Sequence, residues 1–475
     1  METVCRREEK SRRMIRLFRV FIPTSVVGLL LIETVLVFGL YCGVLFWRDD
    51  FSAEIYLLYE GGLGRVSIVT VSILLGLYFN DLYSKLWVRS RVELVQQFCL
   101  VLGIAFLLQS LFAYIAKPLT LGRWNMIVGS AAVLLIVPQF RIAYSHLIFE
   151  VLYRRRVLFL GSSKVSRMAA AAMARRREFG FDAVGYLAPE EMPGERAMGP
   201  WLGPPAAIRK IWEEVKPELI AVGMEERRGQ LPVGQLLDLR MMSVRIEDAS
   251  SLVETLTGRV PLESLRPSSL IFTSDLGPHP GQIRRQVLYS QAIALAGMAV
   301  TLPLMVLAWL AVKLTSRGPA IYSQTRVGLQ GRHYRVHKFR SMYVDAEAAT
   351  GAVWATRDDP RITPVGRWMR KLRIDELPQF FNVLKGEMAI VGPRPERPEF
   401  VAALTMKIPF YGRRHAVMPG ITGWAQINYK YGDTMEDTIT KLEYDLYYIK
   451  HMSMSLDFYI MFQTAKVMLM VRGGQ

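Results

Sequence analysis

Residues 287–312 read VLYSQAIALAGMAVTLPLMVLAWLAV, an apolar run that is long enough to cross a lipid bilayer. Pro303 lies inside this run, where a proline removes one helical N–H group and clashes with the carbonyl four residues earlier. Both flanks are cationic: Arg284, Arg285, Lys313 and Arg317. Because a full crossing would strand one basic flank on the wrong side, the pattern predicts a helix hairpin that enters and leaves on one membrane face, with Thr301 nearest to the freed carbonyls. A kinked fifth span is the alternative.

Four further apolar runs precede this segment, at residues 20–47, 66–88, 94–116 and 124–140. The first run is too long for a cleaved signal peptide, and no small-residue cleavage site follows it. The loop 48–65 carries acidic residues, whereas basic residues cluster around 85–91 and again from Arg141 to Arg156, two spans later. This alternation predicts a transmembrane region of four helices over residues 1–150, with both the N-terminus and everything after the fourth span in the cytoplasm.

The composition agrees with membrane segments joined to soluble domains, since 51% of the 475 residues are hydrophobic and 21% are charged. A net charge of +17 indicates anionic partners, namely lipid head groups, phosphorylated substrates or nucleic acid. Nucleic acid is disfavoured because the basic residues lie beside membrane segments and carboxylates. Three isolated cysteines, Cys5, Cys42 and Cys99, support neither a disulfide framework nor a zinc cluster.

Residues 151–265 have the pattern of a parallel α/β domain. A buried strand at 157–160 is followed by a glycine turn and an alanine-rich helix, and further strands are expected at 182–187, 218–224 and 243–246. Strand, glycine turn and helix are typical of a Rossmann-like dinucleotide-binding fold. Ser163 and Ser166 stand where that fold has its second and third glycines, so a structural or regulatory module without a bound cofactor is favoured. Residues 266–282 are predicted to be a linker before a domain at 283–475.

The chemistry is expected in the stretch RIDELPQFFNVLKG at residues 373–386. Asp375 suits a helix N-cap and Gly386 a helix end, which would place Asp375 and Glu376 at the positive end of a helix dipole. Lys338 and Arg340, two residues apart, would point to one face of a strand. Further cations surround the acidic pair in sequence: Arg361, Arg367, Arg370, Lys371, Arg373 and Arg394. Such a set suits phosphoryl transfer, although a solvated helix start and a basic surface would have the same pattern.

Several motifs between residue 284 and the C-terminus resemble the polyprenyl-phosphate hexose-1-phosphate transferases, also called monotopic phosphoglycosyl transferases or bacterial sugar transferases. They are LTSRGP at 314–319, QTRVG at 324–328, KFRSM at 338–342, DPRIT at 359–363, DELPQ at 375–379, VGPRP at 391–395 and PGITGWAQ at 419–426. The four spans and the α/β domain are similar to the long-form members. The expected architecture is a membrane helical bundle, a soluble Rossmann-like α/β domain and a mixed α/β catalytic domain with a re-entrant hairpin.

The resemblance implies a two-step exchange. Asp375 would attack the β-phosphate of a UDP-sugar and release UMP, and a polyprenyl phosphate would then take the sugar phosphate from the enzyme. Glu376 is implied to bind Mg²⁺, and the implied phosphate ligands are Lys338, Arg340, Arg361, Arg373 and Arg394. The product would start an exopolysaccharide or other surface glycan at the bacterial inner membrane, with the catalytic domain on its cytoplasmic face among membrane lipids.

Some details stay open in the sequence. Trp424 and Gln426 could contact uridine, while a core tryptophan is the alternative. Leu302 stands before Pro303 where many members of the family have serine, which affects the hairpin geometry rather than the chemistry. Glucose or galactose is the preferred sugar, N-acetylated sugars are the alternative, and a homodimer is compatible with the sequence. The competing function is an inactive membrane scaffold that senses a nucleotide through its α/β domain.

Overall fold

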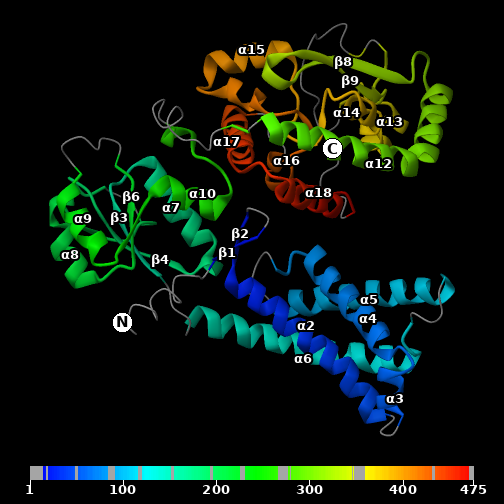
Figure 1. Cartoon of the computed structure of the whole chain (residues 1–475), viewed down its shortest axis with the longest axis horizontal. Coiled ribbons are helices and arrows are strands. Elements are labelled where there is room, and N and C mark those ends of the chain that lie inside the picture. Colours follow the sequence, from blue (N-terminus) through cyan, green and yellow to red (C-terminus); the bar gives the residue numbers. More distant parts are fainter. Residues whose placement is uncertain are drawn as a thin grey trace. The chain divides into compact units, whose positions relative to one another are not determined.

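The computed structural model describes these residues: 14–17, 20–48, 52–83, 91–115, 120–150, 155–192, 196–224, 231–265, 277–278, 280–344, 346, 359–429 and 434–469. By its internal contacts the chain forms two compact units, which are described separately (Figure 1). The first unit comprises residues 1–17, 21–162 and 170–247, and the second comprises residues 18–20, 163–169 and 248–475. The limits of 150, 265 and 282 drawn from the sequence remain predictions about domains.

The first unit contains a bundle of long apolar helices. They are α2 (Thr24–Arg48), α4 (Gly62–Phe79), α5 (Arg91–Ile115) and α6 (Arg123–Glu150). The short strands β1 (Met14–Leu17) and β2 (Val20–Pro23) precede α2, and the short helix α3 (Ala53–Leu58) lies between α2 and α4. These four helices, together with α12 (Pro280–Thr315) of the second unit, are long and apolar enough to cross a membrane. The five predicted apolar segments therefore form helices, and the fourth is longer than predicted.

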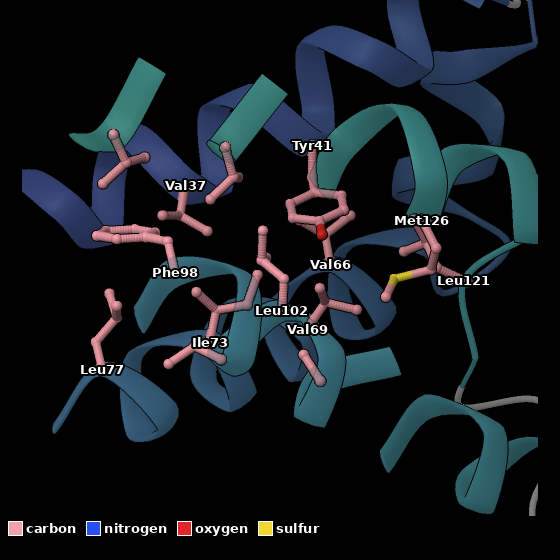
Figure 2. Packing of buried hydrophobic residues seen from close by; sticks show 14 of the residues in the cluster. Val37, Tyr41, Val66, Val69, Ile73, Leu77, Phe98, Leu102, Leu121 and Met126 are labelled. Carbon is pink, nitrogen blue, oxygen red and sulfur yellow. The ribbon is translucent and has the colours of Figure 1, made fainter. Parts of the chain in front are cut away.

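Side chains from α2, α4 and α5 form the centre of the bundle (Figure 2). Tyr41 of α2, Ile73 of α4 and Phe98 of α5 are fully buried there. The Tyr41 hydroxyl has a hydrogen-bonding partner in Ser130 Oγ of α6 at 2.8 Å. Buried apolar surface in the middle and exposed apolar surface outside are the distribution expected of helices that pack together within lipid.

One ion pair is buried inside this bundle. Arg141 lies within α6 and donates hydrogen bonds to both carboxylate oxygens of Glu33 in α2, one of them at 2.8 Å from Nη2 to Oε2. Tyr83 donates to Glu33 Oε2 at 2.6 Å, and Arg141 Nη1 donates to the Leu82 carbonyl at 3.0 Å. The prediction that Arg141 belongs to a basic loop cluster is therefore wrong, because a carboxylate inside an apolar run buries the guanidinium.

The first unit also contains a five-stranded sheet. Its strands are β3 (Arg155–Leu160), β4 (Phe181–Leu187), β5 (Trp201–Gly203), β6 (Leu219–Val222) and β7 (Arg245–Asp248), in the spatial order β5-β4-β3-β6-β7. Strand β3 pairs in parallel with β4 and β6, and β4 pairs in parallel with β5. The connecting helices include α7 (Lys164–Arg175), α8 (Ile208–Val215) and α9 (Val233–Met241). The predicted parallel α/β pattern is confirmed at this level.

The turn between β3 and α7 shows why glycine is needed there and how the helix begins. Gly161 has φ +100°, and a Cβ atom at this position would lie 2.6 Å from the Gly223 carbonyl oxygen. At the start of α7, the Ser166 N–H donates to Ser163 Oγ at 3.2 Å. A side chain of this chain thus occupies one of the N–H groups that a phosphate would use in a dinucleotide site.

The second unit is built from short elements around two small sheets. Strands β8 (Ile321–Val327) and β9 (His333–Phe339) are antiparallel, and β10 (Ala389–Val391) and β11 (Gly420–Thr422) are parallel. Its helices, besides α12, are α10 (Ala249–Thr257), α13 (Pro364–Lys371), α14 (Gln379–Leu384), α15 (Pro398–Lys407), α16 (Trp424–Asn428), α17 (Met435–His451) and α18 (Met454–Leu469). The 3₁₀ segments are η4 (Leu262–Ser264), η5 (Leu329–Gly331), η6 (Ile374–Glu376) and η7 (Tyr411–Ala416).

Helix α12 changes direction along its length, as the green and yellow-green parts of its ribbon show (Figure 1). Before Pro303, Gln286 donates to the Val391 carbonyl at 3.0 Å. After Pro303, Met305 and Val312 pack with Phe339 and neighbouring residues. Both arms of the helix therefore contact the same compact unit, which a straight helix of 36 residues, about 54 Å long, would not achieve.

The predicted partner of the carbonyls freed by Pro303 is not found. By helix geometry the freed carbonyl is that of Ala299, four residues earlier. Thr301 instead donates its hydroxyl to the Gly297 carbonyl at 2.7 Å. This bond is the usual one for a threonine in a helix, to the carbonyl four residues back, so the side chain is already used locally.

The segment that ends the predicted α/β domain, residues 248–265, belongs to the second unit. The Val260 N–H donates to the Glu443 carbonyl at 3.1 Å, and the Leu262 N–H donates to Glu443 Oε1 at 2.9 Å. Trp424 Nε1 donates to the Gly258 carbonyl at 2.6 Å. Most of the predicted linker at 266–282 lies outside the described residues.

Candidate functional site

Three elements bring cations to one carboxylate. Glu376 Oε1 accepts hydrogen bonds from Lys338 Nζ of β9 at 3.0 Å and from Arg394 Nη2, which follows β10, at 2.9 Å. Glu376 Oε2 accepts from Arg373 Nη1 at 3.3 Å. Four residues that are up to 56 positions apart in the sequence thus meet at one buried side chain, as the predicted site requires.

Asp375 lies beside this cluster but has a different setting. Its side chain is 6% exposed, and among the described residues no group donates a hydrogen bond to its carboxylate. Asp375 is inside the 3₁₀ segment η6, and Pro378 is the N-cap of α14. The predicted N-cap role of Asp375 is therefore wrong, because the chain makes a 3₁₀ turn before the α-helix begins.

The backbone of Arg373 supports this arrangement. Arg373 has φ 54° and ψ 24°, in the left-handed region that non-glycine residues rarely occupy. This conformation lies between the end of α13 and the start of η6, and the Arg373 side chain ion-pairs with Glu376. Unusual backbone geometry of this kind concentrates at functional sites, where the surrounding fold holds it in place.

The two carboxylates differ in their tendency to ionise. Burial and the neighbouring Glu376 charge raise the pKa of Asp375 to about 6, against the opposing effect of Lys338, Arg370 and Arg394. Burial also opposes ionisation of Glu376, yet Lys338, Arg394 and Arg373 hold the pKa of Glu376 well below its usual value. Glu376 is therefore ionised at neutral pH. Asp375, whose carboxylate accepts no hydrogen bond from a described residue, is mostly ionised at neutral pH.

Two further residues contribute to the site: Arg370, one of the cations noted near the acidic pair in the sequence, and Asn382, which the sequence did not single out. Arg370 of α13 acts electrostatically on Asp375. Asn382 of α14 accepts a hydrogen bond from the His337 N–H at 3.0 Å and donates to the Arg335 carbonyl at 2.7 Å. Because Asn382 ties α14 to β9, it fixes Lys338 opposite Glu376. A fully buried amide in the apolar run FFNVL was the available signal.

Two predicted phosphate ligands are engaged elsewhere. Arg340 donates to the Arg317 carbonyl at 2.7 Å and to the Ser316 carbonyl at 2.9 Å, so it fastens the turn after α12. Arg361 forms a two-pronged pair with Asp359, with Nε 2.8 Å from Oδ1, and this pair lowers the pKa of Asp359 to about 2. Neither guanidinium joins the cluster around Glu376.

The predicted uridine contacts also have other surroundings. Trp424 is 4% exposed, stacks on Tyr447 with ring centroids 5.5 Å apart and donates its N–H to Gly258. The core alternative therefore describes Trp424 correctly. Gln426 is half-buried and donates to the Ile421 carbonyl at 3.3 Å, while its Oε1 is buried without a hydrogen-bond partner.

The site as a whole is suited to anionic ligands. Three cations meet one permanent anion, Glu376, so positive charge is in excess beside Asp375. Arginine and lysine in such excess stabilise phosphate oxygens and the charge that develops when phosphorus is attacked. Within the described residues no three His, Cys, Asp or Glu side chains converge as metal ligands, so an all-protein metal cage is not formed there.

Comparison with known proteins extends the argument. The model of the family described as bacterial sugar transferase matches residues 284–471. The chain is 46% identical over 218 residues to a UDP-N-acetylgalactosamine-undecaprenyl-phosphate N-acetylgalactosaminephosphotransferase of Aeromonas hydrophila, covering 46% of this chain and 50% of that protein. It is 45% identical over 186 residues to the UDP-glucose:undecaprenyl-phosphate glucose-1-phosphate transferase of Escherichia coli, covering 38% and 40%.

A shorter relative is matched over most of its length. The UDP-glucose:undecaprenyl-phosphate glucose-1-phosphate transferase of Caulobacter vibrioides is 39% identical over 211 residues, which are 43% of this chain and 78% of that protein. By contrast, the chain covers half or less of the length of the relatives from Aeromonas hydrophila and Escherichia coli. The family model covers the part of the chain that holds Asp375, Glu376 and their cations, and the chain belongs to the bacterial sugar transferase family.

Proposed function

We propose that this protein transfers a sugar 1-phosphate from a UDP-sugar to a polyprenyl phosphate and releases UMP. The observation that carries the proposal is the contrast between two adjacent buried carboxylates. Glu376 is neutralised by three cations, whereas Asp375 accepts no hydrogen bond from any described residue and is left as the reactive group. The names of the relatives support the same substrate classes.

The proposed reaction has two steps that balance. In the first, an Asp375 carboxylate oxygen forms a bond to the β-phosphorus of the UDP-sugar, and the bond from this phosphorus to the bridging oxygen breaks, so that UMP leaves with the bond electrons. In the second, a phosphate oxygen of the polyprenyl phosphate attacks the same phosphorus and Asp375 leaves as a carboxylate. Lys338 and Arg394 stabilise the charge on the phosphate oxygens in both steps.

Magnesium is part of the proposal. Mg²⁺ commonly takes one or two protein carboxylates and completes its coordination with substrate phosphate oxygens and water. Glu376 Oε1 accepts from Lys338 and Arg394, so the ion would be held at Oε2, whose hydrogen bond from Arg373 is 3.3 Å long, together with the diphosphate oxygens. When bound, the ion would neutralise phosphate charge and make UMP a better leaving group. Chelation with EDTA should abolish UMP release and added Mg²⁺ should restore it. Full activity in EDTA would remove the ion from the proposal.

The membrane topology follows from the same reasoning. Because both arms of α12 contact one compact unit, we propose that this helix enters and leaves the membrane on one face, the cytoplasmic face of the inner membrane. The site would then meet a soluble UDP-sugar from the cytoplasm and a polyprenyl phosphate from the lipid. Accessibility of a cysteine placed at exposed Leu314 to a membrane-impermeant reagent, compared in inverted and right-side-out vesicles, tests this orientation.

The sugar is proposed to be a hexose such as glucose or galactose, and the relatives include enzymes named for glucose and for N-acetylgalactosamine. The product would start an exopolysaccharide or another surface glycan. The α/β domain is proposed to be a Rossmann-like module that works without a dinucleotide, since Ser163 already caps α7.

The decisive experiment uses the purified full-length protein in lipid with a panel of labelled UDP-sugars and polyprenyl phosphate. We expect UMP release and a lipid-extractable labelled product from at least one donor. Donor alone should leave a sugar-phosphate adduct on Asp375 that mass spectrometry detects. If no donor yields UMP while the isolated α/β domain binds a nucleotide tightly, the scaffold function replaces the transferase.

A further inference from the structure

The loop that carries Arg394 is held by its backbone carbonyls. It connects β10 to α15, and the Arg394 side chain reaches Glu376 from it. Five carbonyls between Val391, the last residue of β10, and Glu396 each accept a hydrogen bond from a fixed donor. Backbone N–H groups bond two of them: Gly420 to Pro393 and Val327 to Glu396, both at 3.0 Å. Side chains bond the other three: Gln286 to Val391 at 3.0 Å, Arg414 to Arg394 at 3.0 Å and Arg326 to Pro395 at 3.2 Å. Two of these donors, Arg414 and Arg326, are charged side chains.

Arg414 is the more deeply buried of the two charged donors. Its side chain is 8% exposed, and Asp445 of α17, its ion-pair partner at 2.9 Å, is 4% exposed. Arg414 Nη1 donates to the Tyr411 hydroxyl at 2.7 Å, while Nη2 donates both to Asp445 and to the Arg394 carbonyl. Burial raises the pKa of Asp445 to about 6 although Arg414 opposes this shift, whereas the contacts with Tyr411 and Asp445 outweigh burial and raise the pKa of Arg414 above its usual value.

A buried ion pair often adds little net stability but can fix one arrangement of the groups around it. Here the pair forms a chain of contacts from α17 through Arg414 to the Arg394 carbonyl, and from the Arg394 side chain to Glu376 Oε1. The planar guanidinium presents its N–H donors in a rigid fork, whereas the three donors of a lysine ammonium group rotate on a flexible stem. An arginine that must meet a phosphate at a set position benefits from a backbone that cannot move.

We infer that Arg414 and Asp445 form a positioning pair that holds Arg394 in register with Glu376 and the substrate phosphates. The expected effect of this pair on turnover rests on the proposed transfer reaction. Its role in holding the Arg394 backbone rests on the contacts alone. Neither residue touches the substrate in this account. They act through Arg394.

The first test uses Arg414→Lys, which keeps the charge beside Asp445 and loses the planar fork. We expect turnover to fall by about 10- to 100-fold, as a displaced catalytic group does, while KM for the UDP-sugar changes less than about threefold. Hydrogen exchange of the amides of Gly392, Arg394, Glu396 and Arg397 should become faster. This second readout needs no activity.

A double-mutant cycle separates positioning from general stability. If Arg414 acts through Arg394, adding Arg414→Lys to Arg394→Ala should reduce turnover by less than about threefold further. The matched control is Glu443→Gln, a carboxylate on the same helix that is 4% exposed and pairs with Arg259 instead. Its effect on turnover should be the same with and without Arg394→Ala.

The outcomes are distinguishable. Non-additivity with Arg394 together with faster exchange supports the positioning pair. Full additivity, or unchanged exchange in a folded Arg414→Lys variant, overturns it. A wild-type protein that releases no UMP from any donor refutes the proposed function, and the exchange experiment then still decides whether Arg414 fixes the loop.

Discussion

Two of the buried glutamates in the described part of the chain, Glu33 and Glu376, are neutralised in different ways. In the membrane bundle, Glu33 meets one guanidinium, from Arg141, and the Tyr83 hydroxyl. In the second unit, Glu376 meets three cations and has a second acid, Asp375, next to it. The first cluster is balanced in charge and has a structural purpose. The second has positive charge in excess and is therefore ready for an anionic ligand.

The largest effect is expected from Asp375→Asn. This change removes the proposed nucleophile and should lower turnover by about 10⁴-fold or more, measured as UMP release. The matched control is Asp457→Asn in α18. Asp457 is also buried with a pKa raised to about 6, but it accepts its hydrogen bonds from Gln286, Tyr289 and Tyr448, and we expect a loss of at most about tenfold. Equal losses of turnover in the two variants would mean that Asp375 matters no more for the reaction than another buried carboxylate.

The second prediction replaces one cation by methionine in each cluster, Arg141 beside Glu33 and Lys338 beside Glu376. Arg141→Met should lower the free energy of unfolding by about 3–5 kcal/mol, because Glu33 loses its counter-charge. Lys338→Met leaves Glu376 with two arginines, so stability should change by about 1 kcal/mol or less while turnover falls by about 10- to 100-fold. Thermal unfolding in detergent and UMP release measure the two effects. The double variant Glu33→Gln with Arg141→Met removes both charges and should recover most of the lost stability. If it does not, the stability lost in Arg141→Met does not come from the unpaired charge of Glu33.

The third prediction concerns pH. Because the pKa of Asp375 is raised to about 6, the nucleophile becomes protonated and kcat/KM should fall tenfold per pH unit below that value. A carboxyl group whose pKa is higher in the folded state than in the unfolded state lowers the free energy of unfolding at pH values above its folded-state pKa. This loss of stability disappears at pH values below its unfolded-state pKa. Asp375→Asn should therefore raise stability at pH 7.5, on the order of 2 kcal/mol, and the gain should vanish as the pH falls from 6 to 4. A gain that does not depend on pH would have another origin.

The smallest effect is expected from Trp424→Phe. The indole N–H that bonds to the Gly258 carbonyl is lost, which should cost about 1 kcal/mol of unfolding free energy. KM for the UDP-sugar should stay within about twofold of the wild type, since the buried ring does not reach a ligand. A tenfold rise in KM with unchanged stability would return Trp424 to the candidate uridine contacts.

The sequence predicted the elements whose pattern is local. Apolar length predicted the five long helices, and alternating strands and helices predicted the parallel sheet. The acidic pair, Lys338, Arg373 and Arg394 were singled out through the motifs that resemble those of the transferase family. These features depend on neighbours in the chain, which is why they can be read without a structure.

The sequence could not assign partners to single charges. Arg340 shares the KFRSM motif with Lys338 and Arg361 lies in the DPRIT motif, but their guanidiniums bind the Ser316–Arg317 turn and Asp359, respectively. Glu33 was hidden in an apolar run, and its pairing with Arg141 spans 108 positions. Which cation meets which carboxylate is decided by tertiary packing, on which spacing along the chain carries little information.

The contacts of residues 248–265 have a practical consequence for dividing the protein. A polypeptide trimmed to start at residue 283 would leave the Trp424 indole without its carbonyl partner and Glu443 without Arg259 and the two N–H groups that now face it. An expressed fragment that begins upstream of Asp248 retains these bonds. We expect the shorter fragment to precipitate on extraction and the longer one to remain dispersed.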